Sequence, residues 1–193
     1  MQLRHSLTLS QALFPQTGIV RDGLLVVAGS VLVALSAQIE IRLPFTPVPI
    51  TGQTFGVLLV GALLGSRRGA AALLLYLLQG TMGLPVFAGG GFGLAHLAGP
   101  TGGYLVGFVA GGSLVGWLAE KGWDRRPATT LVAMGLGNGA IYLFGLAWLA
   151  RFVPTDRLLL AGMLPFLHGD AIKLVLAALA LPGGWAVLGR WRA

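Results

Sequence analysis

Four polar residues stand inside segments that are otherwise apolar, and their spacing places them in two pairs. Asn138 and Tyr142 are four residues apart, and Asp170 and Lys173 are three apart in PFLHGDAIK. Residues at these spacings project from one side of a helix. An ionisable group in hydrocarbon is costly unless it is paired or faces a cavity. The two pairs therefore predict an internal ion pair, the wall of a polar pocket, or both together.

The same residues match known membrane catalysts poorly. An intramembrane aspartyl protease needs a second membrane aspartate beside Asp170, and the predicted spans hold none. A rhomboid-type protease needs a serine facing a histidine, whereas Ser113 in GGSLVG lies in a stripe of small residues. No Gly-Lys-Ser or Gly-Lys-Thr phosphate loop occurs, so any use of ATP falls to another chain. We expect a protein that is not an enzyme and holds no metal or cofactor.

Two loops could complete a pocket around these side chains. In LPFTPVPITGQT, Pro44, Pro47 and Pro49 fix φ and hold the loop extended. Thr51 then precedes one predicted helix and Thr101 another, and a helix start offers N–H groups to an anion. The glycines of FAGGGFG permit close approach of the backbone, which suits either a lid over a ligand or packing between helices.

Composition identifies the setting in which these residues act. Of 193 residues, 55% are hydrophobic and 10% are charged, and the mean hydropathy of +0.82 is too high for a soluble domain. A helix needs about 20 residues to cross a bilayer. We expect an all-α integral membrane protein whose six transmembrane helices cover residues 23–41, 50–65, 69–86, 102–120, 128–150 and 158–181. A lead at 1–22 precedes this membrane domain at 23–181, and a basic tail follows at 182–193.

The basic residues sort by side of the membrane. One side has nine: Arg4, Arg21, Arg67, Arg68, Lys121, Arg125, Arg126, Arg190 and Arg192. The other side has three: Arg42, Arg151 and Arg157. This bias over short loops predicts cytoplasmic termini, with the proline-rich and glycine-rich loops at the outer face. The net charge of +7 is then explained by topology and requires no nucleic-acid partner.

A stripe of small residues runs along the first predicted helix. Ser30, Ala34 and Ala37 keep it free of bulk, which lets another helix approach closely. The approaching helix belongs either to this protein's own bundle or to a partner protein.

Four blocks of the sequence together resemble the BioY family, the biotin-binding S component of energy-coupling factor (ECF) vitamin transporters. These blocks are AQIEIRLPFTPVPITGQTFGVLLVGALLG, LLLYLLQGTMGLPVFAGGGFG, GPTGGYLVGF and PFLHGDAIK. The resemblance implies a six-helix bundle in the bacterial inner membrane, with a biotin pocket near the outer surface. It also implies three partner chains, a transmembrane coupling protein and two ATPase subunits. The stripe at Ser30, Ala34 and Ala37 is the matching candidate for docking the coupling protein.

The resemblance also implies roles for the polar residues. Asn138 and Asp170 would hold the ureido ring, because a carboxylate accepts from N–H groups and an amide both accepts and donates. Tyr142 would stack on the fused ring or donate its hydroxyl. Lys173 would neutralise Asp170 or face the ligand carboxylate, for which the helix starts at Thr51 and Thr101 are alternatives. Further lining candidates are Phe45, Gln53, Phe87 and Tyr104. An S component for another small vitamin stays open as an alternative.

Overall fold

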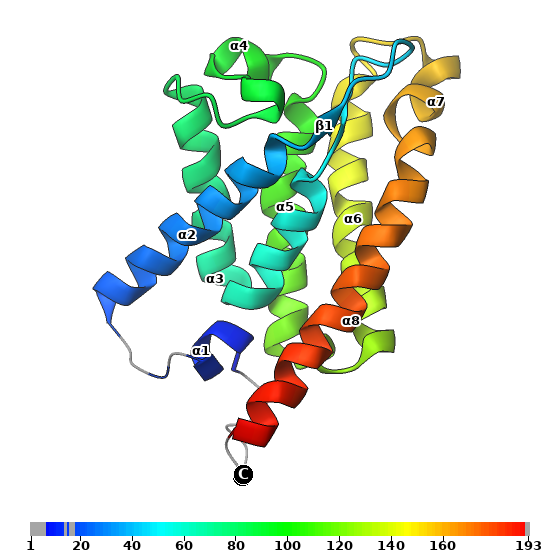
Figure 1. Ribbon diagram of the computed structural model, residues 1–193. Helices are drawn as coiled ribbons and strands as arrows, with labels where there is room; N and C mark the ends of the chain where they lie inside the picture. The colour runs from blue at the N-terminus through cyan, green and yellow to red at the C-terminus, as the bar shows by residue number, and fades with distance from the viewer. Residues whose placement is uncertain (1–6, 14, 16–17, 192–193) are drawn as a thin grey trace.

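The computed structural model describes residues 7–13, 15 and 18–191, which form a bundle of tilted helices (Figure 1). The long helices are α2 (Ile19–Ala37), α3 (Gln53–Thr81), α5 (Gly102–Glu120), α6 (Pro127–Leu149) and α8 (Leu167–Trp191). The short ones are α1 (Leu9–Leu13), α4 (Gly93–Ala98) and α7 (Leu158–Gly162). The 3₁₀ turns are η2 (Ala88–Gly90), η3 (Trp123–Arg125), η4 (Thr155–Arg157) and η5 (Leu164–Phe166). Strands β1 (Glu40–Ile41) and β2 (Ile50–Thr51) make one antiparallel hairpin.

Helix α3 consists of two antiparallel arms. Gly65 has φ 85° and ψ 178°, a conformation that a side chain would strain, and the chain reverses there. Gln53 and Tyr76 are 23 residues apart, yet the Gln53 amide donates to the Tyr76 hydroxyl at 2.6 Å. A straight helix would separate these residues by about 35 Å. Glu120 secures the reversal by accepting the Ser66 backbone N–H at 2.8 Å.

The expectation of an all-α membrane protein is confirmed, apart from the short hairpin. Five helical stretches of the described chain are long and apolar enough to cross a membrane, judged by length and composition. They cover Ile19–Ala37, Gln53–Thr81, Gly102–Glu120, Pro127–Leu149 and Thr155–Gly189. The predicted spans 50–65 and 69–86 both overlap the second stretch, because α3 contains both arms.

The first predicted span lies too far along the chain. We expected residues 23–41, but α2 begins at Ile19 and ends at Ala37. The first turn of α2 contains the charged residue Asp22, which forms an ion pair with Arg68 at 3.1 Å. Arg68 lies at the start of the second arm of α3, so this charge has a partner. Residues 40–41 pair with residues 50–51 as strands instead of continuing a helix.

Other element ends also differ from the predicted ones. The helix predicted over 69–86 ends at Thr81, and Gly83 follows with φ 105°. The predicted tail is helical as far as Trp191, because α8 continues through Pro182. The predicted lead contains α1 and the first turn of α2. Arg4 and Arg192, which contribute to the predicted cytoplasmic charge, lie outside the described residues.

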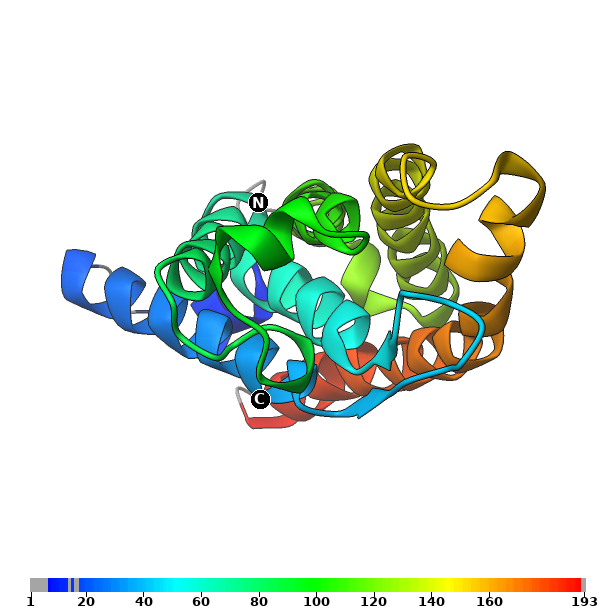
Figure 2. The same cartoon turned by 90° about the horizontal axis from the view of Figure 1, so that it is seen from above.

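Glycines set how closely the central helices pack. A Cβ added to Gly61 of α3 would lie 2.2 Å from the Gly112 carbonyl oxygen of α5, and one added to Gly111 would lie 2.6 Å from the Gly137 oxygen of α6. Backbones can approach this closely only where the side chain is a hydrogen atom. Seen from above, α2 and α8 lie along one side of the bundle and α5 and α6 along the other, with the first arm of α3 between them (Figure 2).

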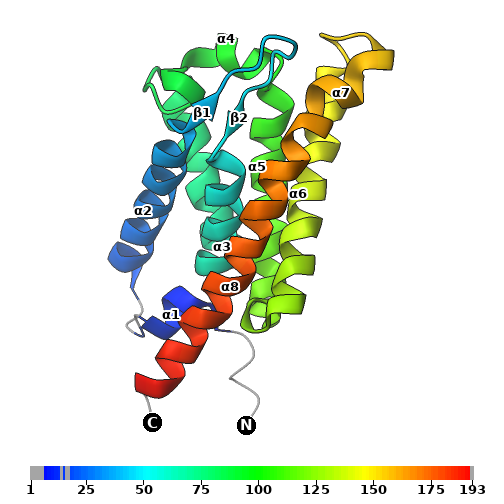
Figure 3. The same cartoon turned by 45° about the vertical axis from the view of Figure 1, so that its right-hand side comes forward.

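The two ends of the bundle are built differently. The hairpin lies above the start of α3 and beside the upper end of α8, whereas α1 packs beside the lower part of α8 (Figure 3). At the hairpin end, the Thr46 hydroxyl donates to the Ala161 carbonyl and so fastens the proline-rich loop to α7. At the other end, the Trp185 indole of α8 donates to Asp124 of η3 at 2.6 Å. The loops that could cover a ligand are therefore gathered at one end.

Candidate functional site

A cavity of about 520 Å³ opens at the hairpin end of the bundle. Its wall is formed by the hairpin and its loop, the start of α3, and parts of α4, α5, α6 and α8. This volume lies within the range of small-molecule sites, which are typically about 300–1,000 Å³. Of the residues predicted to contact a ligand, seven reach this wall: Thr51, Gln53, Thr101, Tyr104, Tyr142, Asp170 and Lys173.

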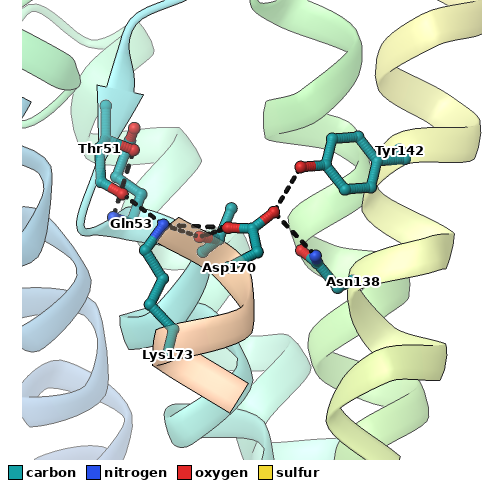
Figure 4. A network of polar contacts seen from close by, with 7 residues as sticks. Thr51, Gln53, Asn138, Tyr142, Asp170 and Lys173 are labelled. Carbon is teal, nitrogen blue, oxygen red and sulfur yellow. Dashed lines mark hydrogen bonds and ion pairs between the residues drawn. The ribbon is translucent and has the colours of Figure 1, made fainter. Parts of the chain in front are cut away.

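Asp170 is the centre of a polar network between three helices (Figure 4). Its side chain is 6% exposed. One carboxylate oxygen, Oδ2, accepts the Asn138 amide of α6 at 2.9 Å and the Tyr142 hydroxyl. The other, Oδ1, accepts Lys173 at 3.1 Å and has a long contact of 3.5 Å with the Thr54 hydroxyl. A carboxylate offers about four acceptor positions, so the position at this long contact is the one that a ligand N–H can most easily take.

Lys173 is fully satisfied by the protein. An ammonium group has three N–H donors, and those of Lys173 reach the Thr51 carbonyl at 2.9 Å, the Thr54 hydroxyl at 2.9 Å and Asp170 at 3.1 Å. Of the two roles predicted for Lys173, the neutralisation of Asp170 is the one that the geometry supports. Thr54 was not predicted as a site residue, although it lies one helical turn after Thr51 in TGQT and its hydroxyl could have been suspected on that ground.

Local sequence explains how α8 presents these groups. Pro165 lies in η5, where its fixed φ suits the entry to a helix. Helix α8 then begins at Leu167 and has Asp170 in its first turn, where the positive end of the helix dipole stabilises a carboxylate. Lys173 follows one turn later on the same face. The span predicted over 158–181 is therefore divided between α7, η5 and α8.

Two further residues of the wall are held by hydrogen bonds rather than by packing alone. Gln53 is 5% exposed and bonds to Tyr76, as described above. The Tyr104 hydroxyl donates to the Gly162 carbonyl at 2.7 Å, and its ring meets Tyr142 edge to face, with centroids 6.5 Å apart. These contacts fix the tyrosine rings before any ligand arrives.

Three of the predicted residues do not line the main cavity. Phe45 is 60% exposed at the outside of its loop, whereas Phe87 is fully buried and stacks on His96 with ring centroids 5.1 Å apart. Asn138 lies behind Asp170 and borders a second cavity of only about 10 Å³. Because its amide N–H₂ must face the carboxylate, its buried Oδ1 atom is left without a partner. The sequence identified these residue types but not the depth at which each one lies.

The two possible helix starts contribute less than expected. Thr51 lies in β2, one residue before the N-cap Gly52, and its hydroxyl accepts the Gln53 N–H at 3.3 Å. Thr101 is the N-cap of α5 and lines the cavity, but its side chain makes no capping hydrogen bond. Thr51 acts on the site chiefly through its carbonyl, which accepts Lys173.

The predicted docking stripe faces the bundle of this chain. Ser30 and Ala37 are fully buried, and Ala34 is half-buried against the core. A Cβ added to the neighbouring Gly29 would lie 2.9 Å from the Ala72 Cβ of α3. The structure thus shows the stripe in contact with α3, and docking of a partner at this stripe stays a prediction.

A second charged pair lies at the cavity wall and was not predicted. Arg42 donates through Nε to Glu40 at 2.8 Å, and both residues line the cavity together with His96 of α4. Burial lowers the pKa of His96, although the nearby Glu40 charge raises it in part. His96 is therefore mostly uncharged at neutral pH. The spacing of Glu40 and Arg42 along a strand was the available signal, since residues two apart share a strand face.

The fold and site define a class of protein: a helical membrane protein with a cavity of small-molecule size whose wall carries a buried polar network. The chain belongs to the BioY family, whose model matches residues 5–190. It is 41% identical over 158 residues to a biotin transporter BioY of Rhizobium etli, covering 78% of this chain and 84% of that protein. It is 43% identical over 150 residues to a biotin transporter BioY of Thermotoga maritima, covering 77% and 86%.

A solved structure has the same fold. It is the crystal structure of the S-component for biotin from an ECF-type ABC transporter, with a TM-score of 0.72 and 24% sequence identity. The match covers 90% of this chain and 91% of the other. Membership of a family whose curated members are named transporters also agrees with the expectation that the chain is not an enzyme.

Proposed function

We propose that this chain is the membrane subunit that captures biotin for an ATP-driven ECF transporter. The observation that carries the proposal is the buried Asp170 network at the cavity wall, in a chain whose relatives are named biotin transporters. Biotin has a ureido ring with two N–H donors and one carbonyl acceptor, a thiophane ring and a carboxylate tail. Asp170 accepts an N–H donor of the ureido ring, and the Tyr104 and Tyr142 rings contact the apolar bicycle.

The proposed topology has six spans, with the two arms of α3 counted separately. Both termini are cytoplasmic and the cavity opens outward. The bias of basic residues supports this orientation: Arg67 follows the reversal of α3 at Gly65, Lys121 ends α5 and Arg126 precedes α6. These element ends lie at the end of the bundle opposite the hairpin (Figure 1). The membrane is then the inner membrane of a bacterium, and biotin enters the cavity from outside.

The proposed partners are a transmembrane coupling protein and two ATPase subunits. A need for partners is consistent with the absence of a phosphate-binding loop from the full sequence. The fold shared with an S-component of an ECF-type transporter supports the same division of labour. Uptake of biotin by vesicles that contain this chain together with such a module, but not by vesicles with the chain alone, is the result expected.

Isothermal titration of the purified protein with biotin tests the capture role. We expect tight binding of biotin and no measurable binding of thiamine or riboflavin, with desthiobiotin as a probe of the thiophane contact. Asp170→Asn removes the charged acceptor but keeps the shape of the side chain, and we expect affinity to fall by about a hundredfold, because hydrogen bonds to charged groups contribute about 1.5–3 kcal/mol each.

Asp156→Asn is the matched control, because Asp156 is exposed in η4 and does not line the cavity. It should bind biotin as the unaltered protein does. Unchanged affinity in a folded Asp170→Asn variant would exclude Asp170 from the site. Tight binding of a different vitamin would show that the chain is an S component for that ligand instead.

A further inference from the structure

We infer that Arg42 holds the carboxylate at the end of the ligand's tail and so selects an acid over its neutral analogues. The inference rests on the proposed function, since it concerns the part of biotin farthest from the ureido ring. It begins with the balance of charge in the cavity. Asp170 with Lys173, and Glu40 with Arg42, are two neutral pairs, so an anionic ligand must draw on a cation that already has a partner.

The other candidates for an anion are already hydrogen-bonded or uncharged. Lys173 has all three of its N–H donors bonded to protein oxygens. At the start of α5, the backbone N–H groups of Gly102 and Tyr104 donate to the Gly99 and Thr101 carbonyls, each at 3.0 Å. His96 is mostly uncharged, as argued above. Lys173 and these two N–H groups of α5 cannot receive a carboxylate without first breaking a hydrogen bond, and uncharged His96 can offer an N–H group but no positive charge.

Arg42 is the cation of the cavity wall that keeps donors available. A guanidinium has five N–H groups, and within the described part of the chain one hydrogen bond is found, from Nε to Glu40. The side chain is 75% exposed, whereas that of Glu40 is 16% exposed. The outer edge of the guanidinium can therefore receive a carboxylate through its two terminal nitrogens, in the planar geometry that arginine favours.

The hairpin places Arg42 relative to the Asp170 network. Glu40 pairs with Thr51 across the hairpin, and the Thr51 carbonyl accepts Lys173. Glu40 lies on the same face of the hairpin as Thr51, and Arg42, directly after β1, also lines the cavity, while Ile41 between them is 60% exposed. The hairpin thus connects the Asp170 network, which is proposed to accept the ureido ring, with the Glu40–Arg42 pair, which is proposed to meet the carboxylate tail.

Glu40 acts here as a positioning residue. It fixes Nε of Arg42 and so directs the free edge of the guanidinium over the cavity. Gly89 of η2 leaves room for this pair, because a Cβ at this position would lie 2.3 Å from Glu40 Oε1 and 2.6 Å from a terminal nitrogen of Arg42. Its φ of 59° also favours glycine. The ligand class that fits is a single carboxylate on a short apolar tail.

The experiment compares biotin with biotinamide, in which the carboxylate is replaced by an uncharged amide. Both ligands are titrated into the purified full chain by isothermal titration. We expect the unaltered protein to bind biotin more tightly than biotinamide. Arg42→Gln should lower the affinity for biotin about fivefold and change the affinity for biotinamide less than twofold. The loss is modest because the guanidinium is exposed and therefore screened by solvent. Raising the salt concentration should shrink the preference of the unaltered protein for the same reason.

Two further variants sharpen the result. Arg157→Gln makes the same change of charge at an exposed position of η4, away from the cavity wall, and should leave both affinities unchanged. Arg42→Lys keeps the charge and should retain most of the preference for biotin. The inference is overturned if Arg42→Gln leaves biotin binding unchanged or weakens both ligands equally. Failure of the unaltered protein to bind either ligand would instead overturn the proposed function, and this inference with it.

Discussion

The pairing of Asp170 with Lys173 predicts a specific pattern of stability. Lys173→Met removes the ammonium group but leaves a carboxylate that is 6% exposed. Breaking a buried ion pair by removing one partner typically costs about 3–5 kcal/mol. Lys173 is 20% exposed at a cavity that water can enter, so we reduce the expected cost to about 2–3 kcal/mol. Asp170→Asn with Lys173→Met removes both charges together and should lie within about 1 kcal/mol of the unaltered protein.

Thermal unfolding in one detergent measures these differences. Five tryptophans provide the fluorescence signal, and a fixed scan rate keeps the variants comparable if unfolding is irreversible. For a chain of this size about 1 kcal/mol shifts Tm by about 2–4 °C. Lys173→Met should therefore lower Tm by about 4–12 °C, and the double variant should recover most of that loss.

Lys121→Met provides a matched control. Lys121 is exposed and lies 3.4 Å from the centre of the Trp117 ring, a contact that contributes about 0.5–1 kcal/mol at an exposed site. Its effect should be smaller than that of Lys173→Met. The reasoning fails if Lys173→Met and the double variant are equally destabilised, because the two charges would then have no energetic coupling.

Two other predictions concern regions outside the cavity. Ala34→Leu should impair biotin uptake with a coupling module but leave the binding of biotin to the isolated chain unchanged. Ala28→Leu, on the exposed face of α2, is the control and should change neither uptake nor binding. The reverse pattern would place docking on that exposed face. Burial raises the pKa of Asp124, although the Trp185 bond and the Arg125 charge lower it in part. The folded state therefore binds the proton more tightly, and stability declines as pH rises through the raised pKa. Asp124→Asn keeps an acceptor for Trp185 and should flatten this decline in Tm above about pH 4, where an unperturbed aspartate is already ionised; an unchanged slope would contradict it.

The sequence determined the class of the protein and the groups that can do its chemistry. Apolar runs of membrane-spanning length indicated helices in a bilayer, because hydropathy is a local property of the chain. The spacings of Asn138 with Tyr142 and of Asp170 with Lys173 indicated shared helix faces, because helical periodicity is also local. The sequence ended one predicted span at residue 65, and the structure reverses the chain at Gly65. The residues that hold this reversal, Ser66 and Glu120, are far apart in the sequence.

The tertiary structure alone decided which faces meet. Lys173 meets Thr51 and Thr54, 122 and 119 residues away, and together with Asp170 these contacts take up its three N–H donors. The burial of a side chain could not be predicted from the sequence either, since Phe45 is exposed and Phe87 is fully buried although both are phenylalanines. Periodicity gives the direction of a side chain from its own helix but not the neighbour in that direction. That neighbour is set by how closely α3, α5 and α6 pack at their glycines, which depends on contacts across the whole bundle.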